Sequence, residues 1–278
     1  MPSSPKRKSE TATPADSDSE SSKKPRISAN SSSTTSLAEE ISFTSPTAAP
    51  DSLINPAAAI AYWSSTSPTV SGVLGGFPQV SRIDLQGSSN FLARLRRGSK
   101  HFPSEKKFRR AVDCGAGIGR ITEGLLVKLA EVVDVVEPVK AFTDKVEGKK
   151  GVGRVWNVGL EDWPPKGAEG EDGREPYDLI WTQWCLGQLT DADAIEYLKR
   201  VQTREILSEG GWIVVKENLS NHHLGEDVYD EVDSSVTRTD LKFRQLFEDA
   251  GLKIASTELQ KGMPKGLYQV RTYALQPR

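Results

Sequence analysis

The chain has few cysteines, no long apolar run and no excess of charge of one sign. Cys114 and Cys185 are too few for a disulfide framework or a zinc site of four thiolates. The apolar run at 57–63 is far shorter than the roughly 18 residues that a transmembrane helix needs. The N-terminus has no secretory pattern, and the net charge of −2 argues against obligatory nucleic-acid binding. We therefore expect an intracellular protein that does not cross a membrane.

Residues 1–50 differ in composition from the rest of the chain. They are mostly Ser, Thr, Pro, Ala and charged residues, so we predict a disordered tail. The basic clusters 6–8 and 23–26 resemble a bipartite nuclear-import signal, which would place the protein in the nucleus, the cytoplasm or both. The alternative interpretation is a solvated tail with scattered charges. Residues 51–278 suit a single α/β domain.

From residue 110 onward, short apolar strands alternate with helices of amphipathic spacing. This alternation predicts a mostly parallel sheet covered on both faces. Two late strands with a glycine- and proline-containing turn between them would add an antiparallel edge. The expected strands are 110–115, 132–137, 155–158, 178–184, 211–217, 253–260 and 267–275, and the expected helices are 118–130, 139–147, 191–207 and 239–250.

A glycine-rich turn, Asp113-Cys-Gly-Ala-Gly-Ile-Gly119, joins the first predicted strand to the first predicted helix. Its glycines remove side chains where a ligand must approach the backbone, and Glu137 ends the next strand, where it could bind both ribose hydroxyls. This combination predicts nucleoside binding. The spacing is not the G-x-G-x-x-G of dinucleotide folds, and Asp113 would repel a pyrophosphate. An acid there suits a cofactor with an ammonium group, such as S-adenosylmethionine.

Several further motifs resemble the protein α-N-terminal methyltransferase family. They are Ile180-Trp-Thr-Gln-Trp184, Gly187 with Leu189-Thr-Asp191, Lys216-Glu-Asn218, Val232-Asp-Ser-Ser-Val236, Tyr62-Trp63, Pro68-Thr-Val70 and Gly72-Val-Leu-Gly-Gly76. The resemblance covers about residues 55–275. It implies a class I (Rossmann-like) S-adenosylmethionine-dependent methyltransferase fold with a seven-stranded sheet and a helical N-terminal cap at about 51–105. It also implies methylation of the free α-amine of proteins that begin X-Pro-Lys or X-Pro-Arg after removal of the initiator Met.

The resemblance assigns site residues by matching position. Asn218 would hold the first residue's carbonyl, Trp184 would stack on the proline, and Asp230 would pair with the base at position three. The cofactor residues would be Asp113, Gly115, Gly117, Arg120, Glu137, Leu160 and Gln183, with Arg120 on the methionine carboxylate. The peptide residues would be Leu74, Trp184, Gln188, Asn218, Asp230, Asp233, Ser235 and Tyr268.

The expected chemistry starts from an amine that is already partly neutral and requires a group that receives one proton. An α-amine has a pKa of about 7.7–8.0, so the neutral nucleophile is already populated near pH 7. Asp233 would orient the amine and accept its proton. The family usually carries a histidine where this chain has Gln188, and glutamine cannot take a proton at neutral pH. We therefore expect Asp233, or a water, to remove the proton, and successive methylation to be less efficient.

Other functions are considered beside this one. A small-molecule or RNA methyltransferase could use the same cofactor fold, but the near-neutral charge speaks against RNA and the acidic loop around Asp230 suits a cationic acceptor. A non-catalytic binding module would need a broken cofactor loop, and no expected glycine is missing. His222 and His223 are adjacent, which is poor geometry for binding one metal, so we predict no metal site. We expect a monomer.

Overall fold

The computed structural model describes residues 48–164 and 175–278. Residues 1–47, which include both basic clusters and nearly all of the predicted tail, lie outside the described residues. Within the described ranges, no helix combines the length and the apolar character needed to cross a membrane.

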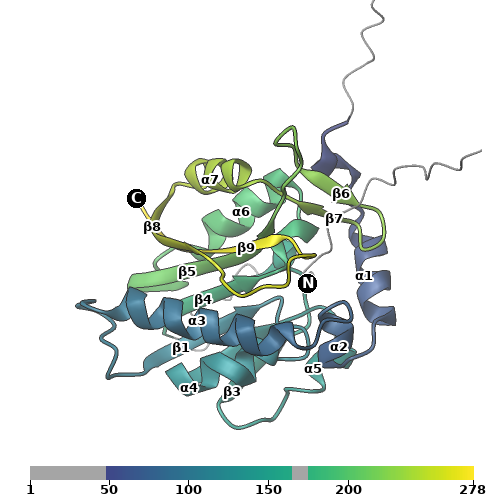
Figure 1. Cartoon of the computed structure of the whole chain (residues 1–278). Helices are drawn as coiled ribbons and strands as arrows, with labels where there is room; N and C mark the ends of the chain where they lie inside the picture. Colours follow the sequence, from purple (N-terminus) through teal and green to yellow (C-terminus); the bar gives the residue numbers. More distant parts are fainter. Residues whose placement is uncertain (1–47, 165–174) are drawn as a thin grey trace, which may run out of the picture. The chain divides into compact units, whose positions relative to one another are not determined.

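A seven-stranded sheet forms the centre of the described domain (Figure 1). The strand order is β3-β2-β1-β4-β5-β9-β8, in which the first five strands are parallel and β9 is antiparallel to both neighbours. This confirms the predicted parallel sheet with an antiparallel edge. The strands are β1 (Phe108–Cys114), β2 (Ala130–Val136), β3 (Val152–Trp156), β4 (Tyr177–Gln183), β5 (Leu207–Leu219), β8 (Leu252–Leu259) and β9 (Gln269–Pro277).

Helices cover both faces of the sheet because alternate strand residues point to opposite sides. Ile180 of β4 packs in the core with α6 (Asp191–Val201) and α7 (Asp240–Asp249). Its neighbour Trp181 packs on the other face with α3 (Val80–Arg96) and a helical segment. That segment consists of a π-helical turn η2 (Thr122–Leu126) and α4 (Val127–Leu129), and Figure 1 shows α3 and α4 on the side opposite α6 and α7.

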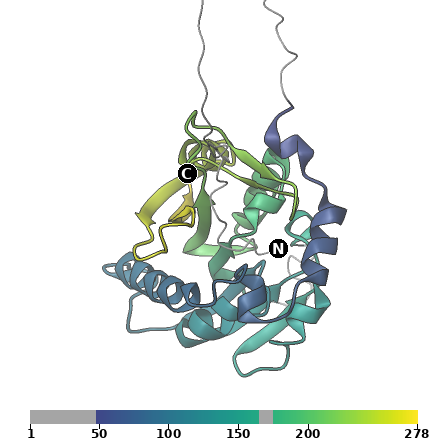
Figure 2. The same ribbon diagram turned by 45° about the vertical axis from the view of Figure 1, so that its right-hand side comes forward.

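A helical cap precedes the sheet, as the resemblance implied. It comprises η1 (Pro50–Leu53), α1 (Pro56–Ser65), α2 (Val70–Val73) and α3. The Asn55 side chain accepts hydrogen bonds from the first free amides of α1, and Pro56 begins that helix, where its missing N–H costs nothing. α1 lies beside the hairpin of β6 (Val228–Asp230) and β7 (Ser235–Thr237) in both views (Figure 2), and the Asn55 amide donates to Ser234 Oγ at 2.8 Å.

Some element boundaries differ from the sequence-based expectation. The helix expected at 191–207 ends at Val201, and β5 begins at Leu207 because this segment pairs with Tyr177. The helix expected at 118–130 contains five π-helical residues and gives way to β2 at Ala130. The expected helix at 139–147 is a single α-helical turn, α5 (Lys140–Thr143), followed by turns. The β6–β7 hairpin was not predicted, because its acidic sequence shows no apolar alternation.

Candidate active site

The carboxyl ends of β1 and β4 meet where the chain reverses its direction across the sheet. Strands β2 and β3 follow β1 on one side of it in the sheet, and β5 follows β4 on the other side. Asp113 of β1 lies beside Trp181 of β4, and Cys114 lies beside Thr182. Ligands of open α/β sheets bind beyond the strand ends at such a reversal. The predicted cofactor residues of both strands therefore share one crevice.

A cavity lies in this crevice, under the cap. It contains about 340 Å³ of empty space, including part of its open mouth. Most of the described residues that line it were predicted from the sequence: Leu74, Asp113, Gly115, Gly117, Arg120, Gln183 and Trp184. The structure thus brings together the glycine turn, the end of β4 and the cap.

Glu137 lies directly after β2, is fully buried and accepts a hydrogen bond from the glycine turn. Its Oε2 accepts the Gly117 amide at 2.9 Å, and its Oε1 accepts the Val139 amide at 2.9 Å. Gly117 has φ +55°, a conformation that glycine adopts without the cost paid by other residues. Burial raises the pKa of Glu137, and the two backbone hydrogen bonds oppose that shift. Each carboxylate oxygen keeps a second lone pair, but the side chain is fully buried and is absent from the described residues that line the cavity, so its ribose contact stays a prediction.

Asp113 is buried at the cavity wall. Thr122 Oγ1 donates to its Oδ2 at 2.6 Å. Burial raises the pKa of Asp113 to about 7, although the Thr122 hydrogen bond and the charge of Arg120 act in the opposite direction. Its carboxyl group is therefore partly protonated near neutral pH, and a cationic ligand would favour the ionised form.

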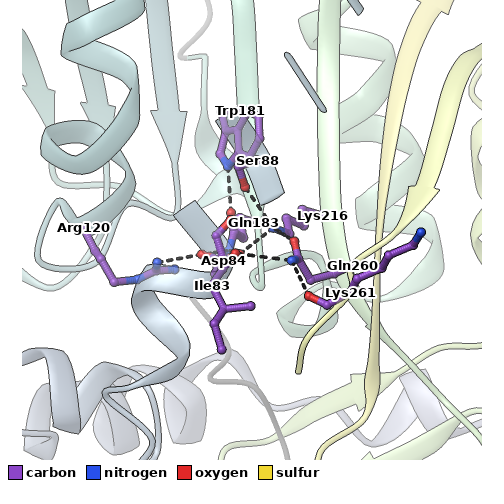
Figure 3. Close-up of polar contacts among 9 residues, drawn as sticks. All are labelled: Ile83, Asp84, Ser88, Arg120, Trp181, Gln183, Lys216, Gln260 and Lys261. Atoms are coloured by element: carbon purple, nitrogen blue, oxygen red, sulfur yellow. Dashed lines mark hydrogen bonds and ion pairs between the residues drawn. The ribbon is translucent and has the colours of Figure 1, made fainter. Parts of the chain in front are cut away.

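Arg120 and Gln183 both contact Asp84, which α3 contributes to the site (Figure 3). Arg120 Nη1 lies 2.6 Å from Asp84 Oδ2, and Gln183 Nε2 lies 3.0 Å from both carboxylate oxygens. The guanidinium carbon of Arg120 lies 5.3 Å from the ring centroid of Trp184. The cation–π contact with Trp184 and the ion pair with Asp84 together hold the Arg120 guanidinium at the cavity wall. Its predicted contact with the methionine carboxylate stays a prediction.

Backbone strain is concentrated next to the predicted peptide residues. In the described part of the chain, Trp184 with φ +54° and Ser234 with φ +51° are the non-glycine residues in the left-handed region. Trp184 lies directly after β4 and is almost fully buried, and its amide donates to the Lys216 carbonyl at 3.0 Å. Ser234 follows Asp233. Strained residues of this kind persist where the surrounding structure fixes them, which is common at functional sites.

Gln188 lines a second cavity together with Leu160 and residues of the cap; it contains about 560 Å³ of empty space, including its open mouth. Gln188 belongs to the turn η4 (Leu186–Gln188), and Glu217 Oε1 accepts the amides of Cys185 and Leu186, at 2.8 and 2.9 Å, at the start of that turn. The Gln188 amide group is buried, and neither of its polar atoms has a hydrogen-bond partner among the described residues. A buried amide of this kind indicates a polar ligand or water at this position.

The acidic residues of the β6–β7 hairpin lie close to two tyrosines. Burial raises the pKa of Tyr62 on α1, with the charges of Asp233 and Asp230 acting in the same direction. Burial, then the charge of Asp230, raises the pKa of Tyr268. Asp233 is itself buried and accepts a hydrogen bond from Ser235 Oγ at 2.7 Å. The predicted peptide residues of the hairpin and of the closing strand are therefore neighbours.

Tyr62 joins this acidic group to the cofactor cavity. Its ring packs against an apolar cluster that contains Leu74 and Trp184, both of which line the cavity. Asn218 lies in β5, opposite Val270 of β9, and is also buried. Among the described residues, the second cavity is lined by two of the predicted site residues, Leu160 and Gln188, and neither of them lines the cofactor cavity.

Sequence reasoning missed Asp84, Lys216 and Tyr62 as site residues. Asp84 occurs on the buried face of α3 with Val80, Ser88 and Phe91, and a carboxylate at such a position is a signal of a paired charge. Lys216 follows the apolar run Trp-Ile-Val-Val of β5, which is the same signal in a strand. Tyr62 belongs to the Tyr62-Trp63 motif of the family resemblance, but nothing in the motif gave it a site role, because an aromatic residue on a cap helix is typical of a core.

The fold and this cavity define an S-adenosylmethionine-dependent methyltransferase, since the glycine turn, the acid after β2 and the crevice suit that cofactor. The family profile described as AdoMet-dependent proline dimethyltransferase matches residues 52–276. The chain therefore belongs to this family. No cluster of three or more metal-ligating side chains suited to a metal ion occurs in residues 48–164 and 175–278; the absence of a metal from the reaction stays a prediction.

Individual relatives agree with the family. The chain is 43% identical over 223 residues to an alpha N-terminal protein methyltransferase 1 of Schizosaccharomyces pombe, covering 79% of this chain and 94% of that protein. It is 39% identical to an N-terminal Xaa-Pro-Lys N-methyltransferase 1 of Rattus norvegicus, covering 77% and 92%. A solved SAM-dependent methyltransferase of Leishmania major superposes with a TM-score of 0.68 at 36% identity, covering 80% of this chain and 82% of that one.

Proposed function

We propose that this enzyme methylates the free α-amine of proteins that begin X-Pro-Lys or X-Pro-Arg. The observation that carries the proposal is the acidic pair of buried Asp233 and half-buried Asp230, whose charges act on Tyr62. The Tyr62 side chain packs against the apolar cluster that contains Leu74 and Trp184 of the cofactor cavity. Two carboxylates beside a methyl donor suit an acceptor that carries an N-terminal amine and a basic third residue. The names of the two relatives, an alpha N-terminal protein methyltransferase and an N-terminal Xaa-Pro-Lys N-methyltransferase, support the same acceptor.

The cofactor, when bound, supplies an electrophilic methyl group on a sulfonium. Asp113 would face its ammonium, Arg120 its carboxylate and Glu137 its ribose, while the glycine turn allows close approach. Arg120 and Asp113 both line the cavity, and their opposite charges suit the two ends of an amino acid. Gln183 lines the same cavity from the end of β4.

The peptide side needs groups that orient the amine, exclude water and accept one proton. Asp233 is buried and held by Ser235, so its carboxylate is preorganised toward an amine. Trp184, fixed by its backbone, would stack on the proline ring. Asp230 would pair with the base at position three, because its side chain lies near Tyr268 and Tyr62 at the hairpin. Asn218 would bind the first carbonyl.

The decisive experiment compares tritium transfer from labelled S-adenosylmethionine to peptides that begin Ser-Pro-Lys and Ser-Ala-Lys. We expect transfer to the first and little to the second, because only proline can stack on Trp184. Equal transfer to both would contradict the acceptor class, and transfer only to a small molecule would favour the alternative, a small-molecule methyltransferase. An RNA acceptor is tested in the same assay, with total RNA in place of peptide.

The role of Asp233 is tested by Asp233→Asn. Loss of a positioned proton acceptor lowers kcat by about 10²–10⁴-fold, while binding of S-adenosylhomocysteine is unchanged. Glu231→Gln is the matched control, because Glu231 is an exposed acid two residues earlier on the same hairpin. A normal kcat in Asp233→Asn would exclude proton transfer to this side chain.

Gln188 is tested through the products. Gln188→His introduces the titratable group that the family usually carries, and we expect a larger share of di- and trimethylated peptide at equal turnover of the first methyl group. Mass spectrometry of the products measures this share, and an unchanged distribution would show that position 188 does not govern successive methylation.

We also propose that the protein acts as a monomer in the nucleus or the cytoplasm, without obligatory nucleic acid. The support is the near-neutral charge and the two basic clusters at 6–8 and 23–26. Fluorescence imaging of the tagged chain, with and without alanines at both clusters, tests the nuclear location. Light scattering tests the monomer.

A further inference from the structure

A buried network of charges joins α3 of the cap to the sheet beside the cofactor cavity (Figure 3). Its centre is Asp84, which is fully buried and accepts from Arg120 and Gln183 on the cavity side. On the other side, Lys216 Nζ lies 2.5 Å from Asp84 Oδ1. One carboxylate therefore has two cationic partners.

Lys216 is as deeply buried as Asp84. Its ammonium group donates to Ser88 Oγ at 2.8 Å, to Gln260 Oε1 at 2.9 Å and to the Asp84 carbonyl at 3.2 Å. These acceptors come from α3 and from the segment after β8, as Figure 3 shows. An ammonium group with all of its donors directed at protein acceptors does not point into the cavity, and Lys216 is absent from the described residues that line it.

The ionisation states follow from the surroundings. Burial alone would raise the pKa of Asp84, but the charges of Lys216 and Arg120 outweigh burial and lower the pKa to about 2. Burial lowers the pKa of Lys216, and the Asp84 charge opposes that shift. With Asp84 and Lys216 both ionised, and Arg120 always charged, these three residues together carry one net positive charge.

The position of that charge matters for the cofactor. Asp84 and Lys216 neutralise each other inside the protein, whereas Arg120 lines the cavity. If Lys216 were absent, Asp84 and Arg120 would form a neutral buried pair. A ligand carboxylate would then have to compete with Asp84 for the guanidinium, at a site already close to Asp113.

We propose that Lys216 is a positioning residue for cofactor binding: by neutralising Asp84, it leaves the positive charge of Arg120 available for the carboxylate of the cofactor. The inference rests on the proposed contact between Arg120 and that carboxylate. It goes beyond that contact, because the Lys216 side chain is absent from the described residues that line the cavity and acts through Asp84, while only its backbone carbonyl contacts Trp184.

The alternative role is purely structural: the network would anchor α3 to the sheet and do nothing else. The two roles differ in what a second substitution does. Under the structural role, cofactor affinity follows the Tm: the double variant Lys216→Met with Asp84→Asn binds more tightly than Lys216→Met only as far as its Tm recovers, because Asp84→Asn also removes a poorly compensated buried carboxylate. Under the proposed role, Asp84→Asn removes the competing anion, so the double variant recovers affinity, while the amide oxygen introduced at position 84 can still accept a hydrogen bond from Arg120.

The experiment measures the Kd of S-adenosylhomocysteine by calorimetry and the Tm of the ligand-free protein. We expect Lys216→Met to weaken binding about tenfold, in the range found for coupled buried groups, and the double variant to return within about threefold of the wild type. In methyl-transfer assays, Lys216→Met should raise KM for S-adenosylmethionine about tenfold and leave KM for the peptide within twofold.

The matched control is Arg94→Ala. Arg94 also joins α3 to β8, through Glu258, but this ion pair is about half exposed and makes no hydrogen bond to Asp84 or Lys216 among those of the described residues, although the Glu258 charge also acts on Lys216. It should leave both Kd and KM unchanged. Wild-type affinity in folded Lys216→Met, or a double variant no tighter than Lys216→Met, would overturn the proposal. If Lys216→Met does not fold, the double variant decides alone: binding more than tenfold weaker than wild type would overturn it.

A separate variant keeps the proposed function distinct. Arg120→Ala should abolish measurable binding of S-adenosylhomocysteine. If it binds normally, the proposed contact between Arg120 and the carboxylate is wrong. If Arg120→Ala loses binding while Lys216→Met does not, the contact stands and the role of Lys216 is wrong.

Discussion

The pH dependence of cofactor binding tests the buried carboxyl group of Asp113. Burial raises its pKa to about 7 in the ligand-free protein, and Thr122 and Arg120 only partly offset that shift. A ligand whose ammonium requires the ionised carboxylate must first remove the proton. The apparent Kd is then the intrinsic Kd divided by the ionised fraction.

The size of the effect follows from that pKa. With a pKa of about 7, roughly one carboxyl in eleven is ionised at pH 6.0 and roughly three in four at pH 7.5. Affinity for S-adenosylhomocysteine should therefore rise about eightfold over this interval, equal to about 1.2 kcal/mol. Calorimetry at several pH values, in buffers of different ionisation enthalpy, measures the affinity and the proton released on binding.

Asp113→Asn is the control for other groups that titrate in the same range. Glu137 has a raised pKa in the same site, so some pH dependence could come from it. We expect Asp113→Asn to bind more weakly and to lose most of the rise. An equally steep rise in Asp113→Asn, or a flat profile in the wild type, would refute the assignment of the ammonium to Asp113.

Three further predictions concern the turn, the hairpin side and the fold. Gly119→Ala should lower the free energy of unfolding by about 1–3 kcal/mol, seen in denaturant melts, because φ is +76° and an added Cβ would lie 2.7 Å from Val146. Arg238→Met should lower the free energy of unfolding by about 3 kcal/mol, measured in the same way, since this buried guanidinium donates to Asp191 at 2.8 Å and to the carbonyls of Leu186 and Leu189. Tyr62→Phe removes a hydroxyl that lies near Asp233 and Asp230; it should raise the peptide KM about fivefold, the size of one hydrogen bond, and leave KM for S-adenosylmethionine unchanged, and equal changes in both would contradict a place for Tyr62 on the peptide side.

The sequence by itself predicted the alternation of strands and helices along the sheet-forming part of the chain, apart from the β6–β7 hairpin, and the position of the glycine turn. Alternating strand and helix patterns and the spacing between Gly115 and Glu137 are local features, so they can be found without coordinates. The short motifs, above all Val232-Asp-Ser-Ser-Val236, carried the family resemblance. Element ends were less accurate, as at Val201 and Ala130, because strand pairing rather than local propensity sets them.

The tertiary structure alone determined which distant residues act together. Asp84 and Lys216 are 132 residues apart, and only the packing of α3 on the sheet brings their charges into contact. The raised pKa of Asp113 likewise depends on burial at the crevice, which is a property of the folded domain and not of its neighbours in the chain. Charge pairing and desolvation act through space, and for that reason the electrostatics of this site could not be obtained from the order of its residues.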